Sequence, residues 1–469
     1  MSACGRSRGG LQGRRLLIAL FLLTLPLVSP KFRGADEIQY FSYLRSAVFD
    51  RDLDFTNEYR HFHERDPQGL AGFKATFLDR REELTGRPIN FAPLGSALLW
   101  SPFYLLAHAG VLVARALGAG VAADGFSLPY LVATTTASAL YGFAALLLVH
   151  ALLRRVGGFG EPHATWTVLA LAYGSPVLYY LTVAPGFAHA PSLFAVALLL
   201  WLWLTRPEGG LGRWALIGAA GGLAALVREQ ELLFLAAPGL YLAWRLFARR
   251  EILRSLARGV VMGAAALAVF TPQLLAYHAL NGRYGPSKLV QRKLSLGSPH
   301  FLQVLFDPGH GLFLWCPLLL AASAGLWVAW RRAAAPDGQH VPGRVIVAAL
   351  GLGFLLQVWI NGALESWSQA GAFGSRRFVS TTPVFAWGLA ALLGALHARV
   401  PRKALAGALL LAVWWNVSLM VQFGLKLMDR QQLEWPRVAV NQVTEVPHRL
   451  ARTLWLYVTD REQLLKETR

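Results

Sequence analysis

The sequence has few charged residues and almost no cysteine. Of its 469 residues, 15% are charged and 55% are hydrophobic, whereas a soluble globular domain carries roughly 25% charged residues. The two cysteines, Cys4 and Cys316, form no CxxC pair and predict no disulfide framework. This composition excludes a soluble enzyme, a disordered chain and a fibrous protein. It predicts an all-α, polytopic integral membrane protein.

Motifs for nucleotide binding and for common hydrolases are also absent. The sequence contains no Walker A loop, no Rossmann glycine fingerprint, no HExxH and no GxSxG, which disfavours a nucleotide-using cytoplasmic enzyme. The net charge is +19, from 45 Lys and Arg against 26 Asp and Glu. No nucleic acid is expected as a partner, because the basic residues form short clusters between apolar segments. Such clusters are typical of topology signals and of contacts with membrane lipids.

Apolar segments of helix length recur along the whole chain. The first, 16–28, follows a group of arginines as a signal peptide would, but no A-x-A-like cleavage site follows it. We therefore expect a retained first transmembrane helix. The later segments are 91–117, 128–153, 164–183, 190–204, 214–227, 231–247, 259–277, 311–330, 345–360, 379–396 and 404–423.

Basic clusters near these segments predict the topology, because positive residues favour the cytoplasmic side. The clusters are at 154–155, 206–213, 245–258, 331–332 and 399–403. If segment 91–117 crossed the membrane, every one of them would face outward. This segment contains Pro93 and Pro102, so we expect it to be a poor continuous helix that lies along the outer membrane surface. The sequence then predicts about 11 transmembrane helices, with the N-terminus inside and the C-terminus outside.

This topology divides the chain into two parts. Residues 1–424 form the transmembrane domain, whose first external loop is 30–126, and 425–469 form an external amphipathic tail. Loops 281–310 and 361–378 are also external. The polar residues that could do chemistry therefore gather on one side. We expect a multi-pass protein of the cytoplasmic (inner) membrane, with its active site on the external, periplasmic face.

An acidic pair, Asp36 and Glu37, comes directly after the first membrane helix. The spacing of apolar residues over 36–48 predicts an amphipathic helix on which Asp36 and Tyr40 share a face. Asp36 could cap this helix or take part in chemistry, and the sequence leaves both interpretations open. A second acidic run, Asp50, Asp52 and Asp54, is either a solvated loop or a site for a divalent cation. No cofactor is indicated with certainty, and metal dependence stays open.

The external loops also contain basic and aromatic residues. Lys288 and Arg292 could hold a phosphate or contact anionic lipid headgroups. In the short loop 361–378, Arg376 and Arg377 depart from the charge rule, which favours a functional role. Trp367 in the same loop could stack on a sugar or an isoprenoid, or anchor the loop at the membrane surface. Arg228, Glu229 and Glu231 interrupt an apolar hairpin at its external turn, where an Arg–Glu pair that only closes the turn is expected.

Together, the acidic pair after the first helix, the long first loop and the many spans resemble the GT-C superfamily of membrane glycosyltransferases. The likeness is greatest to the bacterial branch related to protein O-mannosyltransferases and the lipid A aminoarabinose transferase. The Gly-Ser-Arg-Arg-Phe core of 367–383 is similar to a Gly-x-Arg-Tyr/Phe stretch of that branch. The segment from Arg87-Pro88 to Pro102-Phe103-Tyr104 is similar to the family's membrane-surface segment. The material in 50–81 matches no family motif.

This resemblance implies a polyprenyl-phosphate sugar donor and a lipid, glycan or protein acceptor. Asp36 would be the general base, supported by Glu37 and Tyr40. Phosphate and substrate contacts would come from a further set of residues: Arg87, Lys288, Arg292, Trp367, Arg376 and Arg377. The alternatives are a transporter or flippase of lipid-linked glycans and a noncatalytic envelope-assembly protein. A transporter should have its polar residues within the spans, whereas here the external loops are rich in them.

Overall fold

The structure is a computed structural model that describes residues 5–333, 343–369 and 371–467. Within these ranges the ordered elements are helices, with two isolated bridge pairs and no β-strand. The predicted all-α class is therefore confirmed.

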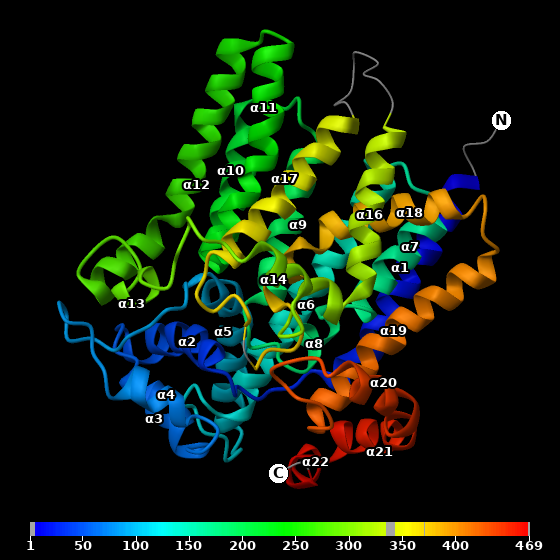
Figure 1. The fold of residues 1–469 in the computed structure, drawn as a ribbon. Helices are drawn as coiled ribbons and strands as arrows, with labels where there is room; N and C mark the ends of the chain where they lie inside the picture. The colour runs from blue at the N-terminus through cyan, green and yellow to red at the C-terminus, as the bar shows by residue number, and fades with distance from the viewer. Residues whose placement is uncertain (1–4, 334–342, 370, 468–469) are drawn as a thin grey trace.

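Long helices form a bundle that accounts for most of the molecule (Figure 1). All but one of the apolar segments named from the sequence contribute helices to this bundle. The bundle helices are α1 (Gly5–Thr24), α6 (Leu128–Arg155), α7 (Glu161–Tyr173), α9 (His189–Thr205), α10 (Leu211–Val227), α11 (Ala236–Ala248), α12 (Ile252–Asn281), α16 (Pro317–Arg332), α17 (Gly343–Gly362), α18 (Thr382–Leu396) and α19 (Arg402–Gly424).

Shorter elements lie between the bundle helices or beyond them. Those of the first loop are α2 (Ala35–Arg45), the short π-helix Ser46–Asp50, α3 (Thr56–Arg65), α4 (Ala71–Phe73) and the short π-helix Lys74–Leu78. The first loop also contains one long helix, α5 (Gly95–Ala116). The others are the 3₁₀ turn Leu25–Leu27, α8 (Val177–Thr182), the 3₁₀ turn Glu229–Leu235, α13 (Lys288–Gln291), α14 (Phe301–Phe306), α15 (Leu312–Trp315), the 3₁₀ turn Arg376–Thr381, α20 (Trp435–Thr444), α21 (Val446–Thr459) and α22 (Arg461–Glu467).

Seven helical stretches in the described ranges are long and apolar enough to cross a membrane. Two shorter apolar helices, α9 and α10, lie among them. These helices confirm a polytopic membrane protein. The number of about 11 spans stays a prediction.

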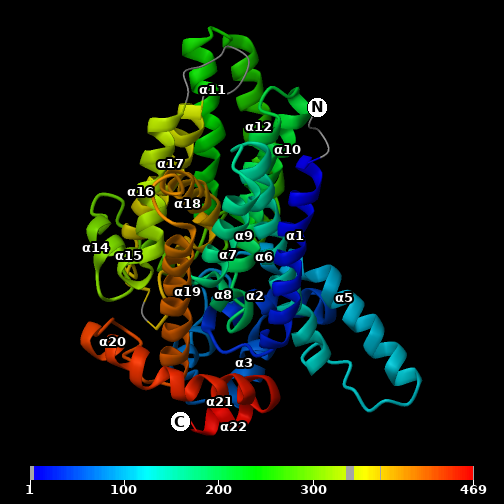
Figure 2. The ribbon, with the colours of Figure 1, turned by 90° about the vertical axis from the view of Figure 1, so that its right-hand side faces the viewer.

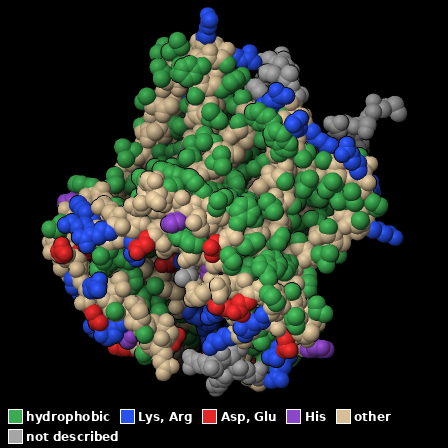
Figure 3. All heavy atoms as spheres, in the orientation of Figure 1, with side chains coloured by type: hydrophobic (Ala, Val, Ile, Leu, Met, Phe, Trp, Pro, Cys, Tyr) green, Lys and Arg blue, Asp and Glu red, His purple; other side chains and the backbone are tan. Residues whose placement is uncertain are grey.

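The two ends of the bundle have different sets of contacts between their loops. At one end, Arg154 Nε lies 2.6 Å from Glu161 Oε2 and Arg258 Nη1 lies 3.9 Å from Glu208 Oε2. Both arginines belong to basic clusters for which the charge rule predicts the cytoplasmic side. At the other end, α2 to α4 and the tail helices α20 to α22 lie together (Figures 1 and 2). Figure 3 shows acidic and basic side chains mixed over this lower end, below a mainly hydrophobic middle.

Helix α5 corrects one expectation from the sequence. It runs unbroken from Gly95 to Ala116 with Pro102 inside it, although the two prolines predicted a poor continuous helix. Pro102 cannot donate to the carbonyl of Leu98, four residues earlier. The Ser101 hydroxyl donates to that carbonyl instead, at 2.8 Å, so the break in the backbone ladder is repaired.

The position of α5 bears on whether it spans the membrane. By length and composition it is one of the seven candidates. However, it runs antiparallel to only the beginning of α6: Trp100 Nε1 donates to Ser138 at 2.8 Å, and His108 lies 2.7 Å from the hydroxyl of Tyr130. The part of α5 after His108 extends beyond the start of α6 and away from the bundle (Figure 2). That α5 does not cross the membrane stays a prediction from the charge rule.

The first loop forms a packed cap on the end of the bundle. Its core contains Phe41, Phe55 and Tyr59, which are fully buried. Trp100 of α5 and Tyr130 of α6 join the same cluster, so the cap is continuous with the bundle. The cap holds α2, and hence the acidic pair at its start, in a fixed position.

Candidate functional site

The structure brings the acidic pair of α2 to the arginine pair of loop 361–378. Asp36 Oδ2 lies 3.1 Å from Arg376 Nη2, and the Asp36 side chain is about half exposed, at 47%. Arg376 is more enclosed, with 20% of its side chain exposed. The two residues are far apart in the sequence, so this ion pair is a product of the fold. It places a carboxylate at the surface beside a guanidinium that phosphate oxygens could also bind.

Glu37, and not Asp36, caps helix α2. Its Oε2 accepts the backbone N–H of Gly34 at 2.7 Å and that of Arg33 at 2.8 Å. These two donors have no partner within the helix, and a carboxylate at the helix start also suits the helix dipole. Glu37 is buried, and its Oε1 has no hydrogen-bond partner. Burial raises the pKa of Glu37 to about 7, although the two backbone hydrogen bonds oppose this rise.

Aromatic side chains lie close to both members of the ion pair. The guanidinium of Arg376 lies 4.8 Å from the centre of the Phe187 ring, at cation–π distance. Tyr40, one helical turn after Asp36, is buried and meets the Trp100 ring edge-on at 6.5 Å. Burial raises the pKa of the Tyr40 hydroxyl above its ordinary value, and the charge of Asp36 adds to the effect. Tyr40 therefore remains a neutral hydroxyl that can donate a hydrogen bond.

Arg377 contacts a second set of polar residues, which includes Ser366 and Arg228. Its Nη2 donates to Ser366 Oγ at 2.9 Å, while its Nη1 is buried with no hydrogen-bond partner. Its backbone carbonyl accepts from Arg228 Nη1 at 3.4 Å. Arg228 also contacts His189 Nδ1 and Glu231 Oε1, both at 3.3 Å. Three arginines thus meet at one place, with Asp36 and Glu231 as the carboxylates in contact with them.

The sequence reasoning missed part of this group. It expected Arg228 to pair with Glu229 or Glu231 and only close a turn. The pair is with Glu231, and Arg228 also donates to the backbone carbonyl of Arg377. Phe187 and His189 were not singled out as site residues. The available signal was the charged pair at membrane depth, because buried charges there are expensive and usually mark function.

Other residues predicted for the site lie elsewhere. Arg87 acts electrostatically on Asp54, together with Arg81, and no hydrogen bond or ion pair in the described ranges joins it to Asp36. Lys288, on the short helix α13, lies 4.0 Å from Glu83 and is largely exposed. Arg292 follows it on the exposed surface. The grouping of these residues with Arg376 thus finds no support in the contacts.

Trp367 lies closer to the arginine pair. It follows Ser366, the partner of Arg377, and its ring centre lies 5.4 Å from that of His300. The backbone N–H of His300 donates to Gly362 at 2.9 Å, which joins loops 281–310 and 361–378. Trp367 also packs against the hydrophobic core of the bundle, and its role in binding a ligand stays a prediction.

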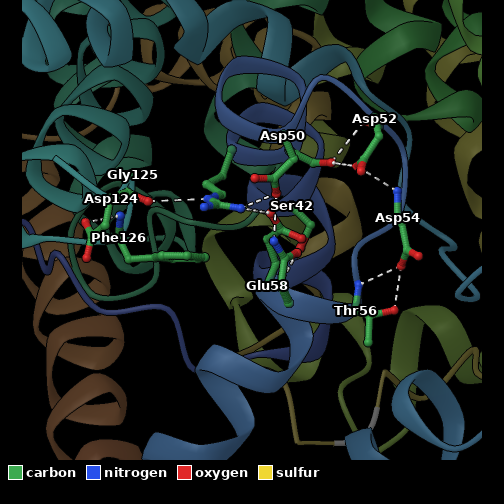
Figure 4. Close-up of polar contacts among 12 residues, drawn as sticks. Ser42, Asp50, Asp52, Asp54, Thr56, Glu58, Asp124, Gly125 and Phe126 are labelled. Atoms are coloured by element: carbon green, nitrogen blue, oxygen red, sulfur yellow. Dashed lines mark hydrogen bonds and ion pairs between the residues drawn. The ribbon is translucent and has the colours of Figure 1, made fainter.

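The acidic run after α2 forms its own network (Figure 4). Asp50 pairs with Arg45, Asp52 Oδ1 accepts from Ser46 Oγ at 2.7 Å, and Asp54 Oδ1 accepts the backbone N–H of Thr56 at 3.1 Å. Each carboxylate closes a local turn. Among the described residues, no group of three or more His, Cys, Asp or Glu is arranged to hold a metal ion.

Arg45 and Glu58 form the inner part of this network. Arg45 Nη1 lies 3.0 Å from Glu58 Oε1, and its guanidinium lies 4.6 Å from the centre of the Phe126 ring. Its Nε also donates to the carbonyl of Asp124 at 3.3 Å, which fastens the end of the α5–α6 connection to the cap. Burial raises the pKa of Glu58 to about 7. The acidic run is thus a structural part of the cap.

Comparisons with known proteins support the expected class. The family model of dolichyl-phosphate-mannose-protein mannosyltransferases matches residues 130–275, which cover α6 to α12. This match supports the resemblance to GT-C membrane glycosyltransferases over that part of the chain, which is less than half of it. The matched residues include Arg228 and Glu231 but neither Asp36 nor Arg376, so the match does not test the roles of the latter two.

Two further comparisons are less informative. No curated protein matches the chain. The crystal structure of ArnT from Cupriavidus metallidurans in the apo state is similar, with 17% sequence identity and a TM-score of 0.49. That likeness covers 95% of this chain and 73% of the ArnT chain.

Proposed function

We propose that this protein is a membrane glycosyltransferase that moves a sugar from a polyprenyl-phosphate donor to an acceptor hydroxyl. The reaction takes place at the outer face of the cytoplasmic membrane. The observation that carries the proposal is the ion pair of Asp36 with Arg376, because it joins a base to a phosphate-binding cation. The family match over residues 130–275 supports the general class.

The arrangement suits transfer from a lipid phosphate. The acceptor oxygen attacks the anomeric carbon, and the bond from that carbon to the phosphate oxygen breaks with its electron pair left on the phosphate. Asp36 takes the proton of the acceptor hydroxyl. Arg376 and Arg377 stabilise the negative charge that grows on the leaving phosphate. The unpartnered Nη1 of Arg377 is a donor available for that purpose.

Binding of the donor would also prepare the base. Without a ligand, Arg376 neutralises Asp36. A phosphate that binds Arg376 competes for the same guanidinium, which leaves the Asp36 carboxylate free to accept a proton. Arg228 would hold the backbone of Arg377 in place through this exchange.

The test is a transfer assay in membranes, with radiolabelled polyprenyl-phosphate sugars and with lipid, glycan and protein acceptors. Asp36→Asn should lower the rate about 10²- to 10⁴-fold at matched expression, as expected for loss of a general base. Asp52→Asn is the matched control, because Asp52 lies in the same loop and bonds only to local groups. Equal rates for wild type and Asp36→Asn would remove Asp36 from the mechanism. Movement of labelled lipid across the membrane without any transfer would indicate the alternative, a flippase.

A further inference from the structure

A second cavity lies between the bundle and the C-terminal tail. Its volume is about 530 Å³, and it is separate from the Asp36–Arg376 pair. We call it the tail cavity; its walls come from α8, α19 and α21, with Tyr179, Val417, Met420, Val421, Leu454 and Tyr457 among the lining residues. The tail helices that close it run across the end of the molecule (Figure 2). Its wall is thus mainly apolar.

Basic side chains also line the tail cavity. Arg33, Lys426 and Arg430 line the cavity and are exposed, and no ion pair within the described ranges joins any of them to a carboxylate. The acidic residue in the lining is Asp66, which bonds to the backbone N–H of Gly69 at 3.1 Å. Arg430 lies over the Phe423 ring at 4.2 Å, which holds its guanidinium at the cavity. An unneutralised group of this kind suits an anion, and phosphate oxygens in particular.

Arg461 holds the tail in place. Its guanidinium donates to the carbonyls of Val28 and Pro26, at 3.1 and 2.9 Å, and lies over the Tyr457 ring at 4.4 Å. The cavity is therefore closed on the tail side by a specific contact with the turn that follows α1.

The apolar part of the cavity continues into the bundle. A second, narrower cavity shares Thr24, Tyr173, Leu178 and Thr182 with it. The narrow part is lined by apolar side chains of α1, α6 and α7, such as Leu17, Phe21 and Phe143. The second cavity, of about 30 Å³, is too small for an acyl chain, so the apolar wall that a lipid chain could use is that of the tail cavity itself.

Helix α8 separates the tail cavity from the proposed catalytic site. Tyr179 lines the cavity and stacks on Phe373 at 4.6 Å. The next residue, Tyr180, lies on the side of the proposed catalytic site. Its ring centre lies 4.6 Å from that of His189 and 5.8 Å from that of Phe187. The two sites are neighbours with different linings.

We propose that the tail cavity binds a lipid with a phosphate headgroup, which sits at Arg33, Lys426 and Arg430 while an apolar chain occupies the walls formed by α8 and α19. Free phosphate shares the headgroup chemistry but cannot use the apolar walls. The proposal does not rest on the proposed transferase activity, because the cavity and its cations are present whether or not Asp36 is catalytic.

The test measures binding of a fluorescent phosphatidic acid to the full chain in neutral detergent, with the matching fluorescent diacylglycerol as the phosphate-free probe. Lys426→Gln/Arg430→Gln should weaken phosphatidic acid binding about tenfold or more, as expected for two lost charge-assisted contacts. Diacylglycerol binding should be unchanged. Val417→Trp should weaken both probes, because it fills the apolar wall. Arg437→Gln is the matched control, since Arg437 lies on the tail but pairs with Glu434 at 3.1 Å.

Several outcomes would overturn the proposal. One is unchanged phosphatidic acid affinity in the double variant. Another is displacement of the lipid by inorganic phosphate at concentrations near the Kd of the lipid, which would indicate a site for the free anion. Asp36→Asn should bind the lipid like wild type, so failure of the transferase proposal and failure of the tail cavity proposal can be told apart. If Val417→Trp does not fold, the affinity of Lys426→Gln/Arg430→Gln for phosphatidic acid still tests the proposal.

Discussion

Asp36 and Glu37 are adjacent in the sequence but have different roles in the structure. Asp36 pairs with Arg376 at the surface, whereas Glu37 is buried and holds two backbone donors at the start of α2. The sequence left open whether Asp36 caps the helix. In the structure Glu37 is the capping residue. Asp36 is left available for chemistry.

The arginine beside Asp36 can be tested with two substitutions. Arg376→Gln should raise the KM for the lipid donor about tenfold and lower kcat, because it removes a cation from both the bound phosphate and the leaving group. Arg376→Lys should recover part of the loss, since a lysine keeps the charge but not the planar fork. The measurement is steady-state transfer in membranes. An unchanged KM and kcat in Arg376→Gln would show that Arg376 does not contact the donor.

The buried carboxyl of Glu37 predicts a pH dependence of stability. Its pKa is about 7 in the folded protein against an ordinary value of 4.5. Between these values the folded state keeps a proton that the unfolded state has lost, so stability falls as pH rises through this range. The total effect is on the order of 3 kcal/mol. In Glu37→Gln the amide oxygen can still accept the two backbone donors, but nothing titrates.

The measurement is the thermal midpoint in detergent across that pH range. The wild-type midpoint should decrease more steeply with pH than that of Glu37→Gln. Glu83→Gln is the control, because Glu83 is largely exposed and its substitution should leave the wild-type profile unchanged. Parallel profiles for wild type and Glu37→Gln would contradict the prediction.

At the scale of elements, close helix packing depends on glycine. A Cβ on Gly388 of α18 would come within 2.0 Å of the carbonyl of Ala322 on α16, and one on Gly325 within 2.0 Å of the carbonyl of Gly388. Small residues allow such backbone contact between membrane helices. The two helices can therefore pack closely only while these positions lack side chains.

This packing gives a prediction with a control on the same helix. Gly388→Ala should destabilise the protein by about 1–3 kcal/mol, because a backbone atom must move to make room. Gly394→Ala should be neutral or slightly stabilising, since nothing lies within 4 Å of a Cβ there. Thermal unfolding in one detergent measures both. Equal midpoints for the two variants would show that α16 and α18 adjust without cost.

The elements were easier to predict from the sequence than the site. Apolar length alone indicated the bundle helices, because a bilayer demands such segments. The continuity of α5 was not predictable from its prolines, since the repair comes from the hydroxyl of Ser101. The pairing of Asp36 with Arg376 depends on how the cap sits on the bundle, which no local pattern encodes. Lys288 and Arg292 were grouped with the site by charge alone, and charge gives no position.

At the scale of the whole molecule, the polar groups are sorted to two ends. The contacts Arg154–Glu161 and Arg258–Glu208 lie at one end, and Asp36–Arg376 lies at the other with the tail. The tail is joined to loop 361–378 by Gln431, whose Oε1 accepts the N–H of Gly371 at 3.0 Å. This sorting agrees with the predicted topology in kind, but the side of the membrane is fixed only by the charge rule.

Site-directed labelling decides the topology and the status of α5 together. Single cysteines at Glu83, before α5, and at Gly120, after it, should both react with an impermeant maleimide added from outside, in a Cys4→Ser background. A cysteine at Gly209, between α9 and α10, should react only after the membrane is opened. The native Cys316 is buried and should stay silent. If Glu83→Cys and Gly120→Cys label from opposite sides, α5 crosses the membrane and the topology of every later helix is inverted. The predicted labelling requires both ends of α5 to lie on the same side of the membrane, so that the unbroken helix runs along the outer surface instead of crossing.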